Sequence, residues 1–195
     1  MTVEEIFTRT SVRSFDGRPV PEEDVELMLK AAMHAPSAMN QQCWEFFVVD
    51  DVGLLQGLSR AAPYAGPVGR APMAIVLAAD KGRMKAPKMW QQDLAAAAQN
   101  ILLAAKSRGI GTVWIGIAPH PDRMAAVSGI MGLPEGLKPF CVIAVGYPFG
   151  DVVPNEGRYK PERVHRNRFV AKDEASSLLR AAFPGMRSWI GGTAP

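Results

Sequence analysis

Two short stretches of the 195-residue chain carry the side chains best suited to chemistry. The first reads RTSVR, in which Arg9 and Arg13 stand four residues apart with the hydroxyls of Thr10 and Ser11 between them. The second, APSAMNQQCW at residues 35–44, places Ser, Asn and Gln side chains after a proline. Guanidinium groups bind phosphate through paired hydrogen bonds, and short polar side chains suit the edge of a heterocycle. The two stretches therefore indicate a bound phosphorylated cofactor and not a side-chain nucleophile.

The basic residues of the first stretch have two interpretations. Alternate residues of an extended segment project to the same side, so Arg9, Ser11 and Arg13 could converge on one ligand. The alternative is a solvated basic turn after a helix, which this stretch taken alone favours. A second basic pair, Arg158 and Lys160, lies near the C-terminus, where the alternative is a charged surface tail. The two groups could meet at one phosphate only through the fold.

The second stretch is a polar loop between a predicted helix and a predicted strand. Its residues of interest are Pro36, Ser37, Asn40 and Gln42. Amide side chains both donate and accept hydrogen bonds, as the edge of a heterocyclic ring requires. For any one of these residues the alternative is an ordinary loop. Further along, Gly116 ends an apolar run, where a glycine either lets the backbone approach a ligand closely or marks a bulge.

Motifs of other enzyme classes do not occur in the sequence. The three histidines, His34, His120 and His165, are scattered without the spacing of metal ligands, so no metal site is expected. There is no nucleophile elbow, P-loop or dinucleotide fingerprint, and the glycines at 109–111 follow a helix where a fingerprint would precede one. An enzyme built on this chain would need a cofactor that brings its own reactivity.

Composition narrows the class of protein. The length and the 48% of hydrophobic residues favour a single domain over residues 1–195. A net charge of +3 without interleaved aromatic and basic residues argues against a nucleic-acid partner. No apolar run is long enough to span a membrane, and the acidic N-terminus does not resemble a signal peptide. Cys43 and Cys141 are expected to be buried free thiols, which fits a cytoplasmic protein.

The apolar patterns predict alternating helices and strands. Helices are expected near residues 2–8, 21–35, 52–62, 90–108 and 122–129. Strands are expected at residues 44–49, 73–79, 112–117 and 140–146. The strands are continuous apolar runs, so both faces of the sheet should be covered. The helix at 90–108 is apolar nearly all round and should lie between the sheet and a further layer, for which a second subunit is one candidate.

Read together, these segments resemble the flavin-dependent nitroreductases. The resemblance runs in the family's order through TRTSVRSFDGRPV at 8–20, LKAAMHAPSAMNQQCWEFFVV at 29–49, DLAAAAQNILLAAKSRGIGTVWIG at 93–116, LPEGLKPFCVIAVGYP at 133–148 and YKPERVHRNRF at 159–169. It implies an α+β fold, with a central mixed, mainly antiparallel sheet flanked by helices. It also implies an intertwined homodimer with FMN at the subunit interface.

The resemblance implies a set of cofactor-binding residues and no catalytic side chain. The set is Arg9, Thr10, Ser11, Arg13, Pro36, Ser37, Ala38, Asn40, Gln42, Trp114, Ile115, Gly116, Arg158 and Lys160. Arg9 and Ser11 resemble contacts to the phosphate and ribityl chain, and Arg13 resembles the cation near N1 and O2 of the flavin ring. The polar loop resembles the segment that lines the ring and, from the partner chain, the phosphate. The backbone at 114–116 resembles the one that reaches flavin N5, and the C-terminal pair resembles a further phosphate contact.

The implied activity is reduction of nitro compounds, quinones or related small molecules by NADH or NADPH. Hydride would pass through flavin N5 in a ping-pong scheme. Two alternatives stay open: a specialised member, such as a dehalogenase, an enone reductase or a flavin-breakdown enzyme, or a flavin-binding protein without catalysis.

Departures from the family pattern bear mainly on the substrate. Cys43 stands where the family often has proline, and a W-I-G sequence replaces the E-G-F-D loop of one branch. Residues 63–89, where many relatives carry substrate-contacting insertions, are compact. This region contains a basic cluster of Lys81, Arg83, Lys85 and Lys88. The cluster could meet the phosphates of NAD(P)H or an acidic acceptor, but a solvated loop is the favoured interpretation.

Overall fold

The computed structural model describes residues 3–154 and 157–169 of the chain. The chain divides into two compact units, Met1–Asn155 and Glu156–Pro195. The second unit contributes the short 3₁₀ helix η4 (Pro161–Arg163) to the described residues. A single domain over residues 1–195 therefore stays a prediction.

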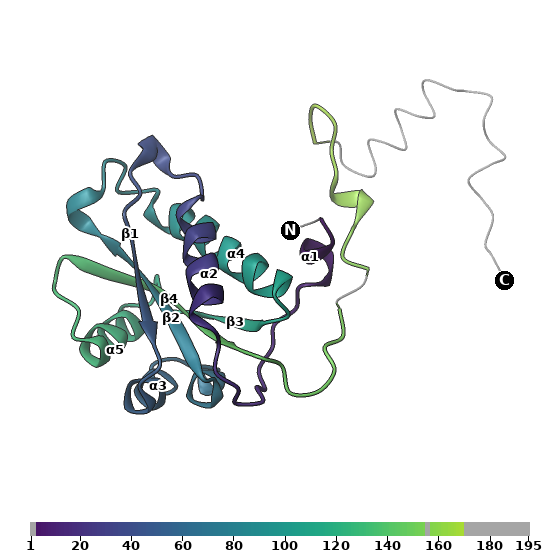
Figure 1. Cartoon of the computed structure of the whole chain (residues 1–195). Coiled ribbons are helices and arrows are strands. Elements are labelled where there is room, and N and C mark those ends of the chain that lie inside the picture. Colours follow the sequence, from purple (N-terminus) through teal and green to yellow (C-terminus); the bar gives the residue numbers. More distant parts are fainter. Residues whose placement is uncertain (1–2, 155–156, 170–195) are drawn as a thin grey trace, which may run out of the picture. The chain divides into compact units, whose positions relative to one another are not determined.

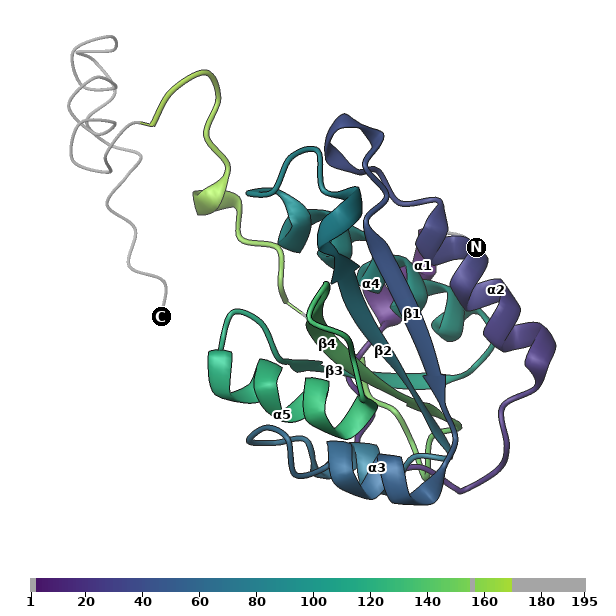
Figure 2. The same cartoon turned by 90° about the vertical axis from the view of Figure 1, so that its left-hand side faces the viewer.

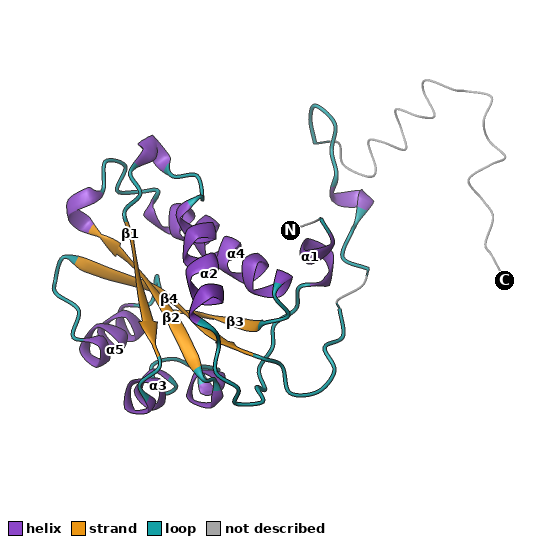
Figure 3. Cartoon of the chain, in the orientation of Figure 1, coloured by secondary structure: helices purple, strands orange, loops and turns teal. Residues whose placement is uncertain are grey.

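A four-stranded antiparallel sheet forms the centre of the first unit, within the described residues (Figures 1 and 3). The strands are β1 (Trp44–Val49), β2 (Met73–Asp80), β3 (Gly111–Gly116) and β4 (Leu137–Gly146), in the order β1-β2-β4-β3. All three strand pairs are antiparallel, and a parallel bridge joins Ser11 to Thr112 at the sheet edge. This arrangement confirms the predicted α+β class with a mainly antiparallel sheet.

Helices cover both faces of this sheet (Figure 2). The first face packs against α2 (Glu22–Met33) and α4 (Trp90–Ser107), and the second against α3 (Val52–Leu58), η2 (Gly66–Arg70) and α5 (Pro121–Met131). Successive residues of β2 alternate between the two layers, so Ile75 joins the first core and Val76 the second. Both faces therefore need apolar side chains, which explains the continuous apolar runs.

The long helix α4 packs against both the sheet and α2, in agreement with its all-round apolar character. Leu94 and Ile101 are fully buried, and the alanines of the helix let α2 approach closely. Asn100 Nδ2 also donates to the carbonyl of Ala31 on α2, at 2.9 Å. The helix ends before Gly109, whose φ of 71° is the left-handed conformation that a helix C-terminus often requires. The second layer over α4 is therefore supplied, at least in part, by the same chain.

Several boundaries differ from the sequence expectations. Helix α1 (Glu4–Thr8) has Val3 at its N-cap position, and residue 2, where the helix was expected to begin, lies outside the described residues. Strand β4 begins at Leu137, because residues before the apolar run also pair with β2. Helix α3 ends at Leu58, although the helix was expected to continue to residue 62, and the 3₁₀ turn η2 follows it. Both cysteines are buried and free, as expected.

Among the described residues, no helix combines the length and apolar character needed to cross a bilayer.

Candidate cofactor site

The RTSVR stretch lies across the end of the sheet where β3 begins and β4 ends. Ser11 forms its parallel bridge with Thr112, and the Val12 N–H donates to the Thr112 carbonyl at 2.9 Å. Beyond it, Phe15 forms an antiparallel bridge with Pro148 just after β4. Of the two conformations left open for this stretch, the structure has the extended one at Ser11 and Val12, and backbone hydrogen bonds fix its position on the sheet.

A surface pocket opens where this stretch meets the C-terminal end of α4. Its lining includes Arg9, Thr10 and Val12 from the stretch, Lys106 from the last turn of α4, and residues 109–112. The lysine has no ion-pair partner in the described part of the chain. A helix C-terminus carries about half a negative elementary charge, which two full cations outweigh. Cations and a hydroxyl around one pocket suit a phosphate group.

Lys106 was missed by the sequence analysis. A basic residue in the last turn of a helix is favourable for the helix dipole alone, so its position carried no functional signal. Only the packing of α4 against the RTSVR stretch brings Lys106 to the same pocket as Arg9.

The guanidinium of Arg13 is exposed and has no carboxylate partner among the described residues. Its recorded hydrogen bond goes to a backbone carbonyl two residues earlier, at 3.4 Å. Other arginines nearby are already paired: Arg18 Nε lies 2.6 Å from Asp16, and Arg108 Nε lies 2.5 Å from Asp24. The Arg18 backbone N–H, followed by its side chain, lowers the pKa of Asp16, and the hydrogen bond from Arg108 to Asp24 raises the pKa of the arginine. Arg13 is thus a cation available to a ligand.

The polar loop at 36–42 has an unusual backbone. Met39, Asn40 and Gln42 have φ values of 52°, 50° and 42° in the left-handed region, which asparagine tolerates better than the other two. Each such residue costs on the order of 1–3 kcal/mol and persists only where the surrounding structure holds it in place. Within the loop, the Gln42 N–H donates to Ser37 Oγ at 3.1 Å, and Gln42 Nε2 donates to Asn40 Oδ1 at 2.8 Å. Strain of this kind concentrates at functional sites.

A buried carboxylate on α4 holds this loop. Asp93 is 5% exposed and accepts from the Ala38 N–H at 3.0 Å and from Gln41 Nε2 at 2.5 Å. Gln41 Oε1 in turn accepts from the Ala86 N–H at 2.8 Å. The neighbouring Cys43 thiol has a raised pKa, first because of burial and then because of the Asp93 charge. The sequence analysis missed both Asp93 and Gln41, although an isolated acid in an apolar helix was a usable signal.

The backbone at the end of β3 is open. A Cβ on Gly116 would meet no atom within 4 Å, and the strand register continues through Gly116 opposite Cys141, so the glycine does not mark a bulge. Its carbonyl accepts from Arg123 Nη1 at 3.1 Å. Two residues earlier, the Trp114 ring packs edge-on against Phe140, with 5.5 Å between centroids. The open backbone agrees with the expected close approach of a ligand.

Two of the candidate segments contact opposite ends of α4 within one chain. The RTSVR stretch shares its pocket with Lys106 near the end of α4, whereas the polar loop bonds to Asp93 in the first turns of α4. Asp93 and Lys106 are thirteen positions apart on this helix, a distance of about 20 Å along the axis. The two segments therefore do not meet within one chain. Such a separation is expected if each site combines one segment from each of two subunits.

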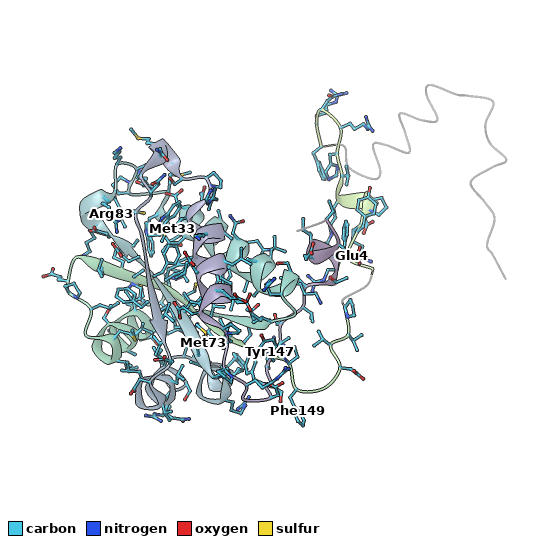
Figure 4. All side chains as sticks on the ribbon, in the orientation of Figure 1. Glu4, Met33, Met73, Arg83, Tyr147 and Phe149 are labelled. Atoms are coloured by element: carbon cyan, nitrogen blue, oxygen red, sulfur yellow. The ribbon has the colours of Figure 1, made fainter. Side chains whose placement is uncertain are left out.

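Two further candidates have different outcomes. Arg158 and Lys160 belong to the second unit and are exposed, and their approach to the phosphate stays a prediction. In the basic cluster, Arg83 bonds to Glu45 and Asp80 and is a structural residue. Figure 4 shows Arg83 at one end of the first unit, far from Tyr147 and Phe149 at the other.

The sequence pattern that defines the Nitroreductase family matches residues 6–65 and 56–147. The chain belongs to the nitroreductase family. It is 43% identical over 167 residues to an Archaeoglobus fulgidus protein provisionally named NADH dehydrogenase/NAD(P)H nitroreductase, across 84% of this chain and 96% of the relative. The nitroreductase-family fold is shared with an FMN-dependent nitroreductase from Clostridium difficile, with a TM-score of 0.79, 29% identity and coverage of 86% and 100% of the two chains. A provisionally named nitroreductase from Desulfovibrio desulfuricans, solved in complex with FMN, has a TM-score of 0.73, 27% identity and coverage of 86% and 97%.

Proposed function

We propose that this nitroreductase-family chain is an FMN-dependent oxidoreductase that uses NADH or NADPH to reduce nitro compounds, quinones or related small molecules. The observation that carries the proposal is the pocket lined by Arg9, Thr10 and Lys106. Arg13, four residues after Arg9, has no carboxylate partner among the described residues. The names of the relatives, which include FMN and NAD(P)H, give independent support.

The donor set of the chain fits FMN in its chemistry. Arg9, Thr10 and Lys106 bind the phosphate, because two cations and a hydroxyl match its charge and its acceptor oxygens. Arg13 stabilises negative charge on the pyrimidine side of the ring, which favours the reduced cofactor. The open backbone at Gly116 lets the ring approach β3 without steric conflict. When bound, FMN takes up hydride from a nicotinamide and passes the electrons to the acceptor.

The site is composite. We place the polar loop of one chain against the RTSVR stretch of a second copy, because the two groups lie about 20 Å apart along α4 of the same chain. The proposed assembly is therefore a homodimer with two equivalent sites. Its substrate is a small molecule that enters where both chains contribute to the wall.

The test is a spectrum of the purified protein followed by anaerobic titration. We expect a yellow protein, or a colourless one that turns yellow with added FMN, whose visible absorption bleaches with NADH or NADPH. Nitroaromatic and quinone acceptors should then restore the colour. A protein that binds FMN but resists reduction by both nicotinamides would be a flavin-binding protein without catalysis. A folded protein that takes up no FMN would refute the proposal.

A further inference from the structure

The strained polar loop is held in place by hydrogen bonds to a residue outside the loop. The hydrogen bonds among Ser37, Asn40 and Gln42 do not anchor the loop to the rest of the chain. That attachment comes from Asp93, which binds the backbone at the start of the loop and the Gln41 side chain in its middle.

The anchor uses a charged group where a neutral one would be the simpler choice. Elsewhere on α4, Asn100 ties the helix to α2 with a neutral amide. Asp93 is buried without a cation partner among the described residues, and the partners recorded for it are the Ala38 N–H and the Gln41 amide. A buried carboxylate is costly to desolvate, but it accepts from both donors at once with charge-assisted strength. Hydrogen bonds of that strength can hold left-handed residues that the loop alone would not keep.

Gln41 extends the anchor to a second segment. Its Oε1 accepts from the Ala86 N–H at 2.8 Å, and its Nε2 also lies 3.4 Å from the Ala86 carbonyl. The side chain is 5% exposed, so both ends of the amide are used inside the protein. The polar loop is therefore fixed to α4 on one side and to residues 81–89 on the other.

We propose that Asp93 and Gln41 are positioning residues that hold the loop at 38–42 in the conformation that receives the flavin. Neither touches the cofactor in this scheme. They keep Met39, Asn40 and Gln42 left-handed before the cofactor arrives, so that binding does not have to reorganise the loop. This inference rests on the proposed function, because it assumes that the loop contacts FMN.

The test exchanges the charge between the two residues. In Asp93→Asn, the introduced amide nitrogen faces Gln41 Nε2, and because both groups are donors the hydrogen bond between the two side chains is lost. If the Gln41 amide turns so that its oxygen accepts from the introduced amide, that oxygen no longer accepts from the Ala86 N–H. One hydrogen bond is therefore lost in either orientation of Gln41. Adding Gln41→Glu restores both bonds, because one oxygen of the introduced carboxylate accepts from the amide introduced at position 93 and the other from the Ala86 N–H. The net charge of the pair is unchanged. The full-length chain carries each single substitution and the pair, so that coupling is measured directly.

The matched control is Asp24→Asn. Asp24 is also a buried carboxylate, 4% exposed, but it pairs with Arg108 at the opposite end of α4, away from the loop. Arg108 lies between the pocket residues Lys106 and Gly109, so this variant can also change FMN affinity. We expect it to melt at a lower temperature and to gain no FMN affinity from added Gln41→Glu, because Asp24 does not contact the loop. Asp93→Asn should instead bind FMN about tenfold more weakly, as the loss of a buried hydrogen bond to a charged group implies.

The readouts are the dissociation constant from FMN fluorescence quenching and the shape of the bound flavin absorption band. Recovery of affinity in the double variant, above both single variants, supports the proposal even if Asp93→Asn alone folds poorly. Wild-type affinity and an unchanged band in a folded Asp93→Asn variant would refute it while leaving the proposed function intact. A double variant that binds no better than the weaker single variant would also refute it. Failure of the wild-type chain to bind FMN would remove both proposals together.

Discussion

Cys141 is a buried thiol whose environment has a measurable consequence. It is fully enclosed in the middle of β4, and burial raises its pKa well above the ordinary value of 9.0. The folded chain therefore keeps a proton that the unfolded chain releases at alkaline pH. The stabilisation from this difference is complete below the unfolded pKa and is lost as the pH rises toward the folded one.

We expect the free energy of unfolding to fall above about pH 9, with Cys141 contributing up to about 1.4 kcal/mol per pH unit. In Cys141→Ala the decline should be shallower, because the titrating group is gone, even though the variant is less stable at every pH. Urea unfolding between pH 7 and 10 measures the two slopes. Parallel slopes in the two proteins would show that the thiol does not titrate in this way.

Residue types alone indicated a ligand at the RTSVR stretch but could not complete the site. Arg9 and Arg13 carried a signal because their spacing suits an anion. Lys106 carried almost none, because its partner in the pocket lies about a hundred residues away in sequence. Asp93 stood out as an isolated acid in an apolar helix, but its partner at Ala38, 55 residues away, was not predictable. The packing of α4 creates these contacts, and no local pattern encodes them.

At the scale of the element, β3 begins and ends with glycine for different reasons. A Cβ on Gly111 would lie 2.7 Å from Val12, so this glycine permits close packing of the RTSVR stretch. A Cβ on Gly116 would meet nothing within 4 Å, so internal packing does not require a glycine there. One strand thus has a glycine that serves packing and a glycine that we assign to the ligand.

The two glycines give a paired prediction. Gly111→Ala should destabilise the chain by about 1–3 kcal/mol, as overpacking does. Gly116→Ala should change the stability by less than about 0.5 kcal/mol and yet weaken FMN binding, because its methyl group occupies the approach to the strand. Urea unfolding of the flavin-free protein and FMN titration measure the two effects. Equal destabilisation by both substitutions, or full FMN affinity in Gly116→Ala, would contradict the assignment.

The elements themselves could largely be predicted from the sequence. The strands β1 to β4 were apolar runs, and glycine or proline marked at least one end of β2, β3 and β4. The helices α2 and α4 had helical spacing with a clear stop at Pro36 or Gly109. The order β1-β2-β4-β3 was not predictable, because strand pairing depends on contacts between distant segments. Met33 is apolar but 51% exposed at the last residue of α2, so its residue type alone would have misplaced it in the core.

At the scale of the whole molecule, the proposed homodimer makes a prediction about mixed subunits. Arg13→Ala and Asn40→Ala should each weaken FMN binding in a dimer of identical chains, whereas Lys81→Ala should not. A heterodimer that carries one of these substitutions in each chain has one site with both defects and one site with neither. About half of its sites should then bind FMN with wild-type affinity.

Differently tagged copies expressed together and purified by both tags provide this heterodimer, and FMN titration counts the sites. If each site were built from a single chain, every site of the heterodimer would carry one defect, and none would bind with wild-type affinity. The result therefore decides between a composite site and a single-chain site, whatever the acceptor is.

The division of β2 between two packed layers also matters for engineering. One layer contains Ile75 and the helix α4, which carries Asp93, the residue that binds Gln41. Leu58 and Val68 lie in the other layer. A protein engineer seeking heat tolerance can therefore redesign the positions around Leu58 and Val68 with little risk to redox performance, provided that Ile115, which shares this core and belongs to the candidate cofactor residues, is kept.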